Sequence, residues 1–200
     1  MRSEQNAPKL IVFSDPSIPD RTSSLREENH RKYLLDEITK KLGVLISLNV
    51  DHVVICCVTV HALLPDLPQS VQEKITSLVT VILSEVLASS EKHLLLCSSG
   101  SRECQLFESH ELWPRSESQI IMPTYSDQRR IQKLIYDIKE NRVTESQYRT
   151  LPGLLEKYNV QSYICGCTEL HVYKKLLFQR AAHNFRCIDP LQSIADHMRR

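Results

Sequence analysis

Two cysteines of the chain stand at the same kind of position, between a strand-like apolar run and a helix-like stretch. The run DHVVICC ends at Cys57, and Thr59 follows two residues later. The run SYICGC ends at Cys167, and Thr168 follows directly. Such a cysteine lies at the carboxyl end of a strand and the amino end of a helix, where open α/β sheets bind ligands. Unpaired N–H groups and the helix dipole lower a thiol pKa there, so the pattern favours acid–base chemistry by two thiols.

The same residues can also be interpreted as small buried apolar side chains, since free cysteine is among the most buried residue types. For Cys57 and Cys167 the pattern alone leaves both interpretations open. Cys56 and Cys97 lie inside apolar runs, so we expect them to be packing residues. The chain has seven cysteines and no export signal at its start, so we expect reduced thiols and a cytoplasmic protein.

Short apolar runs alternate along the chain with longer amphipathic stretches. We expect strands at 9–13, 52–57, 92–97, 119–122, 162–165 and 185–188. Prolines interrupt the helical pattern of 61–76, so two shorter pieces are expected there. The remaining helices are expected at 26–42, 127–139, 150–158, 169–179 and 191–200. This alternation predicts an α/β fold with mainly parallel sheets flanked by helices.

The composition argues against several classes of function. The net charge of +1, from 25 basic and 24 acidic residues, gives no general attraction to nucleic acid or acidic lipid. No apolar run approaches the ~18 residues of a membrane-spanning helix. We therefore expect neither a nucleic acid nor a membrane as partner. Glycine-rich phosphate loops, dinucleotide fingerprints and serine-nucleophile elbows are missing from the sequence, which leaves kinase, dehydrogenase and hydrolase functions without support.

Five short motifs, taken in order, carry a resemblance to a known family. They are IPDRT at 18–22, CCVTVH at 56–61, CSSGS at 97–101, GCTEL at 166–170 and CIDPLQSIADHM at 187–198. The set resembles the aspartate/glutamate racemase family, isomerases that invert amino acids without pyridoxal phosphate or another cofactor. GCTEL is similar to the second-cysteine motif, CCVTVH to the first, and IPDRT to the substrate-arginine segment of the aspartate racemase branch.

The resemblance implies a two-base mechanism and a set of site residues. One thiolate removes the α-proton of an amino acid, and the thiol on the opposite face delivers a proton. The residues that match the family's catalytic pair are Cys57 and Cys167. The residues that match its substrate-binding positions are Arg21, Thr59, Thr168 and Lys139. The implied ligand is an acidic amino acid, aspartate before glutamate because of IPDRT, and a homodimer is among the implied assemblies.

Some of these assignments have open alternatives. Lys133 and Arg142 lie near Lys139 in the sequence and could supply the second cation instead. His61 and His171 follow the two cysteine motifs at similar offsets. Each histidine could tune a thiol, or could stand in a first helical turn without a role. Glu169 could hydrogen-bond locally at a helix start, or could position Cys167.

The resemblance further implies two pseudo-symmetric lobes with the active site between them. We expect a first lobe of residues 1–79 plus 180–200 and a second lobe of residues 80–179. The family opens with a strand and a glycine-rich turn, whereas the first strand-like run here matches the family's second strand. We therefore expect a first lobe that lacks one strand at its N-terminus. Val58 stands where the family motif has asparagine, and valine has no hydrogen-bonding side chain.

Two rival hypotheses compete with an active racemase. A racemase-like binding protein without catalysis would account for Val58 and the incomplete first lobe. A metal site would use the C-x-C pair Cys165 and Cys167. Zinc sites typically have two to four residues between paired cysteines, so this spacing disfavours a metal, and none is expected.

Overall fold

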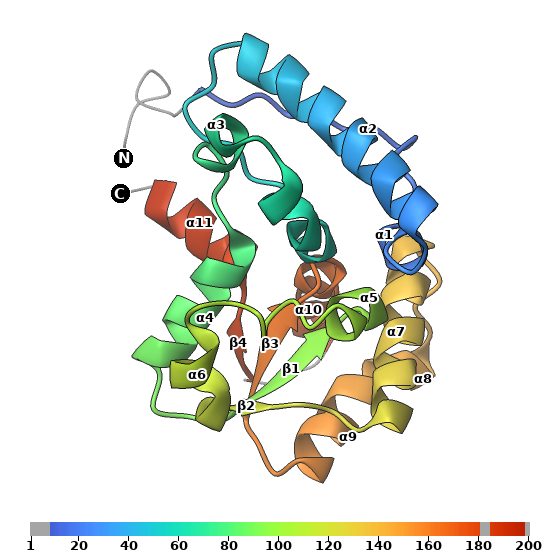
Figure 1. The fold of residues 1–200 in the computed structure, drawn as a ribbon. Helices are drawn as coiled ribbons and strands as arrows, with labels where there is room; N and C mark the ends of the chain where they lie inside the picture. Colours follow the sequence, from blue (N-terminus) through green and yellow to red (C-terminus); the bar gives the residue numbers. More distant parts are fainter. Residues whose placement is uncertain (1–8, 181–184, 199–200) are drawn as a thin grey trace.

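A parallel β-sheet forms the centre of the molecule in the computed structural model, which describes residues 9–180 and 185–198 (Figure 1). Within these residues four strands pair in the order β2-β1-β3-β4. The strands are β1 (His93–Cys97), β2 (Ile120–Ile121), β3 (Ser162–Gly166) and β4 (Arg186–Ile188). Each neighbouring pair is parallel. The predicted α/β class with a parallel sheet is therefore confirmed.

The two central strands are apolar throughout because helices cover both faces of the sheet. Every residue of β1 and of β3 is buried. On one face, Leu94 and Leu96 pack against α7 (Tyr125–Lys139), α9 (Thr150–Lys157) and α10 (Glu169–Arg180). On the other face, Leu95 and Ile164 pack mainly against α4 (Leu78–Ala88). This two-sided cover explains why the strands read as continuous apolar runs rather than as an alternation.

In the sheet-containing part of the chain, helices alternate with strands as predicted. Among them, α7 carries a buried apolar stripe and α10 begins directly after the GCT motif. The helices are α1 (Arg21–Ser24), α2 (Glu28–Ser47), the 3₁₀ helix η2 (Val58–Asp66), α3 (Gln69–Gln72), α4 (Leu78–Ala88), α5 (Ser99–Glu103), α6 (Trp113–Ser116), the 3₁₀ helix η3 (Glu117–Gln119), α7 (Tyr125–Lys139), α8 (Glu145–Tyr148), α9 (Thr150–Lys157), α10 (Glu169–Arg180) and α11 (Pro190–Met198).

Two segments expected to be strands, 9–13 and 52–57, do not form them. Residues 9–13 pair with no strand of the described chain, and Leu10 and Val12 are 73% and 80% exposed. In the second segment a single bridge joins Val53 to Ile75. Apolar, β-branched residues make a strand only where a neighbouring strand accepts their backbone hydrogen bonds, and the described residues offer these segments no such ladder. The prediction of a strand was therefore wrong for both segments.

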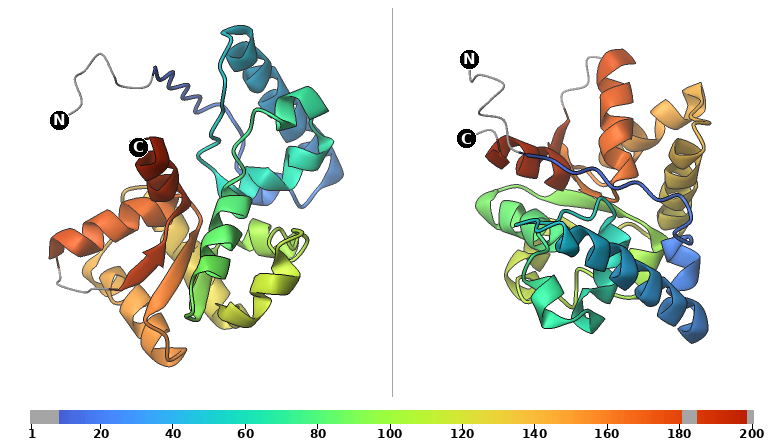
Figure 2. Two further views of the ribbon diagram at one scale, coloured as in Figure 1. Left: turned by 90° about the vertical axis from the view of Figure 1, so that its left-hand side faces the viewer. Right: turned by 90° about the horizontal axis from the view of Figure 1, so that it is seen from above.

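Helices and loops make the core of this first part of the chain. A cluster around Leu34, Ile38 and Leu63 joins α2 to η2. The expected interruption in 61–76 is present, since η2 ends at Asp66 and α3 begins at Gln69. Figure 2 shows α2 and α3 to one side of the sheet, and α1 and η2 contact α5, the helix that follows β1.

The closing segment of the chain lies against the sheet. Strand β4 pairs with β3, and α11 contacts α4. Residues 199–200 of the predicted closing helix lie outside the described part. The division into lobes 1–79 plus 180–200 and 80–179 stays a prediction. In the described part of the chain, no helix has the length and apolar character needed to cross a membrane.

One glycine is required for the close approach of β3 to β1. A Cβ atom on Gly166 would lie 2.8 Å from the Leu96 carbonyl oxygen and 2.9 Å from Cys97 Cβ. Real Cβ atoms do not approach backbone this closely, so a larger residue would separate the strands. Cys167 is the next residue, so the close approach of Gly166 to β1 also determines the position of the Cys167 backbone and of its thiol.

Candidate active site

The two predicted catalytic cysteines come from distant segments and lie at one site. Cys57 precedes η2, and Cys167 lies between β3 and α10. The Thr168 hydroxyl donates a hydrogen bond of 3.0 Å to the Cys56 carbonyl, which ties the two motifs together. The two thiols are close enough for their charges to interact, and this interaction contributes to the raised pKa of Cys167. The tertiary structure therefore brings the pair together.

The two thiols have different environments. Cys167 is 5% exposed, whereas Cys57 is half-buried. Cys167 Sγ donates to Glu169 Oε2 at 2.8 Å. Burial, followed by the negative charge of Glu169, raises the pKa of Cys167 well above its usual range. At neutral pH this thiol is therefore protonated and can act as an acid.

Arg21 lies beside Cys57. It is the first residue of α1, and its guanidinium interacts with the Cys57 thiol and with the carboxylates of Asp20 and Glu169. Burial opposes the charge of Arg21, but these neighbours raise its pKa overall. A permanent positive charge therefore stands beside the more accessible of the two sulfur atoms.

Lys139, the last residue of α7, supplies a second cation to the same group of charges. Its Nζ is 3.3 Å from Asp20 Oδ2 and 3.8 Å from Glu169 Oε1. Asp20 also accepts a hydrogen bond from the Tyr136 hydroxyl at 3.2 Å. Burial opposes the charge of Asp20, but the Ser23 N–H and the Lys139 ammonium lower its pKa overall. The side chains of Arg21, Glu169, Asp20 and Lys139 thus form a continuous charged network at the two thiols.

The alternatives to Lys139 have other partners. Lys133 Nζ lies 2.6 Å from Asp137 Oδ2, and Arg142 pairs with Glu140. Of these three basic residues, Lys139 is the one that joins the charged network.

Thr59 is more completely buried than the other predicted substrate-binding residues. It is 3% exposed, and its hydroxyl forms a buried triangle with the hydroxyls of Ser98 and Ser101 at 2.8 and 3.2 Å. Ser98 also caps α5 by accepting from the Ser101 N–H. The triangle therefore holds η2 against the amino end of α5, next to Cys57.

Val58 belongs to the apolar core beneath the site. It is 1% exposed and packs in the cluster that contains Leu78, Val79 and Ile82. Its side chain contributes to packing in this core and offers no hydrogen bond to the site.

The histidines after the two cysteine motifs bind groups other than the thiols. His61 Nδ1 donates to the Cys57 carbonyl at 3.0 Å, and its Nε2 accepts from the Leu78 N–H at 3.0 Å. Burial lowers the pKa of His61 to about 4, so its ring is neutral at neutral pH. His171 has its Nδ1 2.8 Å from Asp189 Oδ2. Both histidines therefore hold the structure around the site together rather than contact a thiol.

Three parts of the site are not identified by the sequence analysis. Asp20 lies inside the IPDRT motif, and a charged residue next to a predicted substrate-binding arginine is a signal that could have found it. Tyr136 belongs to no motif. Ser98 and Ser101, the buried partners of Thr59, lie in the CSSGS motif, whose sequence indicates a turn but not a contact with η2.

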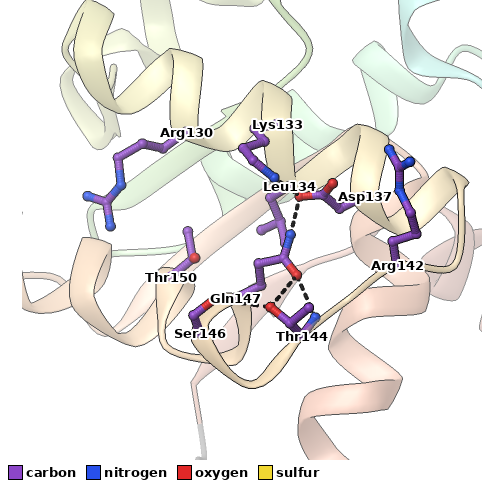
Figure 3. A pocket seen from close by; sticks show the side chains of 9 residues that line it. All are labelled: Arg130, Lys133, Leu134, Asp137, Arg142, Thr144, Ser146, Gln147 and Thr150. Atoms are coloured by element: carbon purple, nitrogen blue, oxygen red, sulfur yellow. Dashed lines mark hydrogen bonds and ion pairs between the residues drawn. The ribbon is translucent and has the colours of Figure 1, made fainter.

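A surface hollow of about 560 Å³ lies apart from this site. Helix α7 and the α8–α9 segment border it (Figure 3). Its lining includes none of the residues predicted for catalysis or substrate binding, although the alternative cations Lys133 and Arg142 lie on it. The cations on its wall are paired with acidic side chains. Across the described residues, no group of three or more His, Cys, Asp or Glu side chains is arranged to hold a metal ion.

The architecture and the site together limit the class of protein. It is an α/β protein with a parallel sheet, in which two cysteines from distant segments share one charged site. The family model for Asp/Glu/Hydantoin racemase matches residues 1–198. The chain therefore belongs to the Asp/Glu/Hydantoin racemase family.

Solved structures of similar fold agree with this family. An aspartate racemase from Picrophilus torridus matches with a TM-score of 0.79 and 18% identity, over 99% of this chain and 81% of that chain. An aspartate racemase homologue from Pyrococcus horikoshii OT3 matches with a TM-score of 0.65 and 14% identity, over 100% and 87%. A glutamate racemase from Francisella tularensis, in complex with D-glutamate, matches with a TM-score of 0.57 and 16% identity, over 93% and 69%. At these identities the likeness shows the shared fold.

Proposed function

We propose that the protein is a cofactor-independent racemase of acidic amino acids, with aspartate preferred over glutamate, and that Cys57 and Cys167 transfer the protons. The observation that carries the proposal is the charged network that joins the two thiols, which come from segments far apart in the sequence. Family membership supports the reaction class, an isomerase that inverts a carbon centre.

The different environments of the thiols suggest their roles in one direction of the reaction. Cys57, the more accessible sulfur beside the Arg21 guanidinium, would be the base that removes the α-proton. Cys167, buried and hydrogen-bonded to Glu169, would be the thiol that delivers a proton to the other face of the carbon. The carbanion formed by the first transfer is consumed by the second, so the substrate loses one proton and gains one. In the reverse direction the two residues exchange roles.

The cations of the site suit a substrate with two carboxylates. Arg21 has a planar fork of donors that matches a carboxylate, and Lys139 adds a second positive charge. We assign the side-chain carboxylate to Arg21 and Lys139, and the α-carboxylate to Thr168 and to backbone N–H groups near Thr59, whose hydroxyl is occupied in the buried triangle. A dicarboxylic substrate would replace the ion pairs that the cations now make with acidic side chains of the protein.

The test measures racemisation and α-proton exchange separately. Purified protein is incubated with L-aspartate, D-aspartate or L-glutamate in D₂O, and the products are resolved by chiral chromatography and mass spectrometry. Cys57→Ser and Cys167→Ser should each abolish racemisation, because serine is a poor base near neutral pH. Cys104→Ser is the control, since Cys104 is exposed and lies outside the charged network. Near wild-type racemisation by Cys57→Ser would refute the two-thiol mechanism.

One observation favours a second candidate, a racemase-like protein that binds an acidic amino acid without inverting it. The side chains of Val58 and Thr59 both lie in the core, so neither presents a free polar group at the surface of the site. In the D₂O experiment, this candidate predicts no deuterium incorporation at the α-carbon. A separate calorimetric titration should still detect binding of aspartate.

A further inference from the structure

Two cysteines outside the charged network are in contact with each other. Cys165 Sγ on β3 lies 3.3 Å from Cys187 Sγ on β4. The strands are neighbours, and Cys187 is registered with Tyr163, two residues before Cys165. Both side chains therefore point to the same face of the sheet, because residues two apart in a strand share a face.

The two thiols differ in accessibility. Cys165 is 1% exposed, and Cys187 is half-buried. The Tyr163 hydroxyl and the Lys174 ammonium lie near the Cys187 sulfur. Reaction of a thiol with an oxidant requires access to the sulfur, and Cys187 is the more accessible of the two. Cys187 is thus placed to react with the oxidant first, and Cys165 is placed to attack the oxidised Cys187 sulfur.

We propose that Cys165 and Cys187 are an oxidation site that forms a reversible disulfide with a peroxide as the oxidant. In the first step the Cys187 thiol attacks hydrogen peroxide, one oxygen is transferred to sulfur, and water leaves, giving a sulfenic acid. In the second step the Cys165 sulfur attacks the Cys187 sulfur, the S–O bond breaks, and the hydroxyl leaves with the Cys165 proton as water. Two thiols are oxidised, and one peroxide is reduced to two waters. The sulfur atoms must approach by about 1.3 Å to reach the S–S distance of ~2.05 Å.

The test looks for the linked peptides. The folded protein is treated with hydrogen peroxide, remaining thiols are blocked, and a tryptic digest is analysed without reduction. The peptide of Cys165 also contains Cys167, so fragmentation of the linked peptide and variants together assign the link. The linked peptide should form in wild type and in Cys167→Ser, and should be absent from Cys165→Ser and Cys187→Ser. Dithiothreitol should release it.

Two results would overturn the proposal. One is a wild-type digest in which the Cys165 and Cys187 peptides are recovered unlinked after oxidation that has modified other cysteines. The other is a link that persists in Cys165→Ser but is lost in Cys167→Ser, which would assign the disulfide to Cys167. If a variant fails to fold, fragmentation of the wild-type peptide still distinguishes the two sulfur atoms.

Discussion

The buried histidine beneath Cys57 makes the stability of the protein depend on pH in a defined window. His61 joins the Cys57 carbonyl to the Leu78 N–H, and burial lowers its pKa from 6.5 to about 4. Because the folded-state pKa is below the unfolded value, the unfolded chain binds a proton between these values that the folded protein does not. The stability from neutral His61 is therefore complete above pH 6.5 and is lost as the pH falls toward 4.

The size of this effect follows from the lowered pKa. A fall from 6.5 to about 4, at about 1.4 kcal/mol for each tenfold change in proton affinity, gives roughly 3 kcal/mol of stability lost between pH 7 and pH 4. The perturbation is His61→Gln, which keeps a donor and an acceptor but does not titrate. We expect the variant to be less stable at pH 7, by about 1–3 kcal/mol, because its hydrogen bonds to the two backbone groups are imperfect.

The assay is urea unfolding, followed by circular dichroism, of both proteins at several pH values from 7 to 4. The other titrating groups are the same in both proteins, so their contributions cancel in the difference between them. The stability of wild type relative to the variant should fall steadily below pH 6.5, by roughly 3 kcal/mol at pH 4. Parallel curves for the two proteins would refute the assignment of His61 as a buried neutral link.

Two further predictions concern the strand contact and the substrate cation. Gly166→Ala should destabilise the protein by about 1–3 kcal/mol in urea unfolding, because the added Cβ meets the Leu96 carbonyl at 2.8 Å. Gly153→Ala is its control, since apart from its chain neighbours and the backbone of its own helix no atom lies within 4 Å of the added Cβ. An equal loss of stability in both variants would contradict the explanation. Arg21→Lys should weaken aspartate binding by about 1.5–3 kcal/mol in calorimetry, because lysine keeps the charge but loses the fork of donors. Equal affinity of variant and wild type for aspartate would show that Arg21 does not bind the substrate.

Local patterns in the sequence were sufficient to predict the sheet-containing part of the fold. The runs that form β1 and β3 are apolar on both faces, and α7 has its apolar residues at helical spacing. A local apolar pattern predicts the element correctly where the strands and helices that the element must pack against are present. The same holds for Cys167, which follows β3 and precedes α10, whereas Cys57 precedes η2 but follows no strand among the described residues.

Contacts between distant parts of the chain decided which of the predicted strands and charged residues have partners in the structure. Residues 9–13 have the composition of a strand, but no strand of the described chain lies beside them, so they stay unpaired and exposed. Lys133 and Lys139 look alike in the sequence, yet Lys133 bonds to Asp137 and Lys139 to Asp20, 119 residues away. The ion pair of Lys133 is local, but strand pairing and the ion pair of Lys139 depend on groups distant along the chain, and the local sequence does not say which distant groups will be within reach.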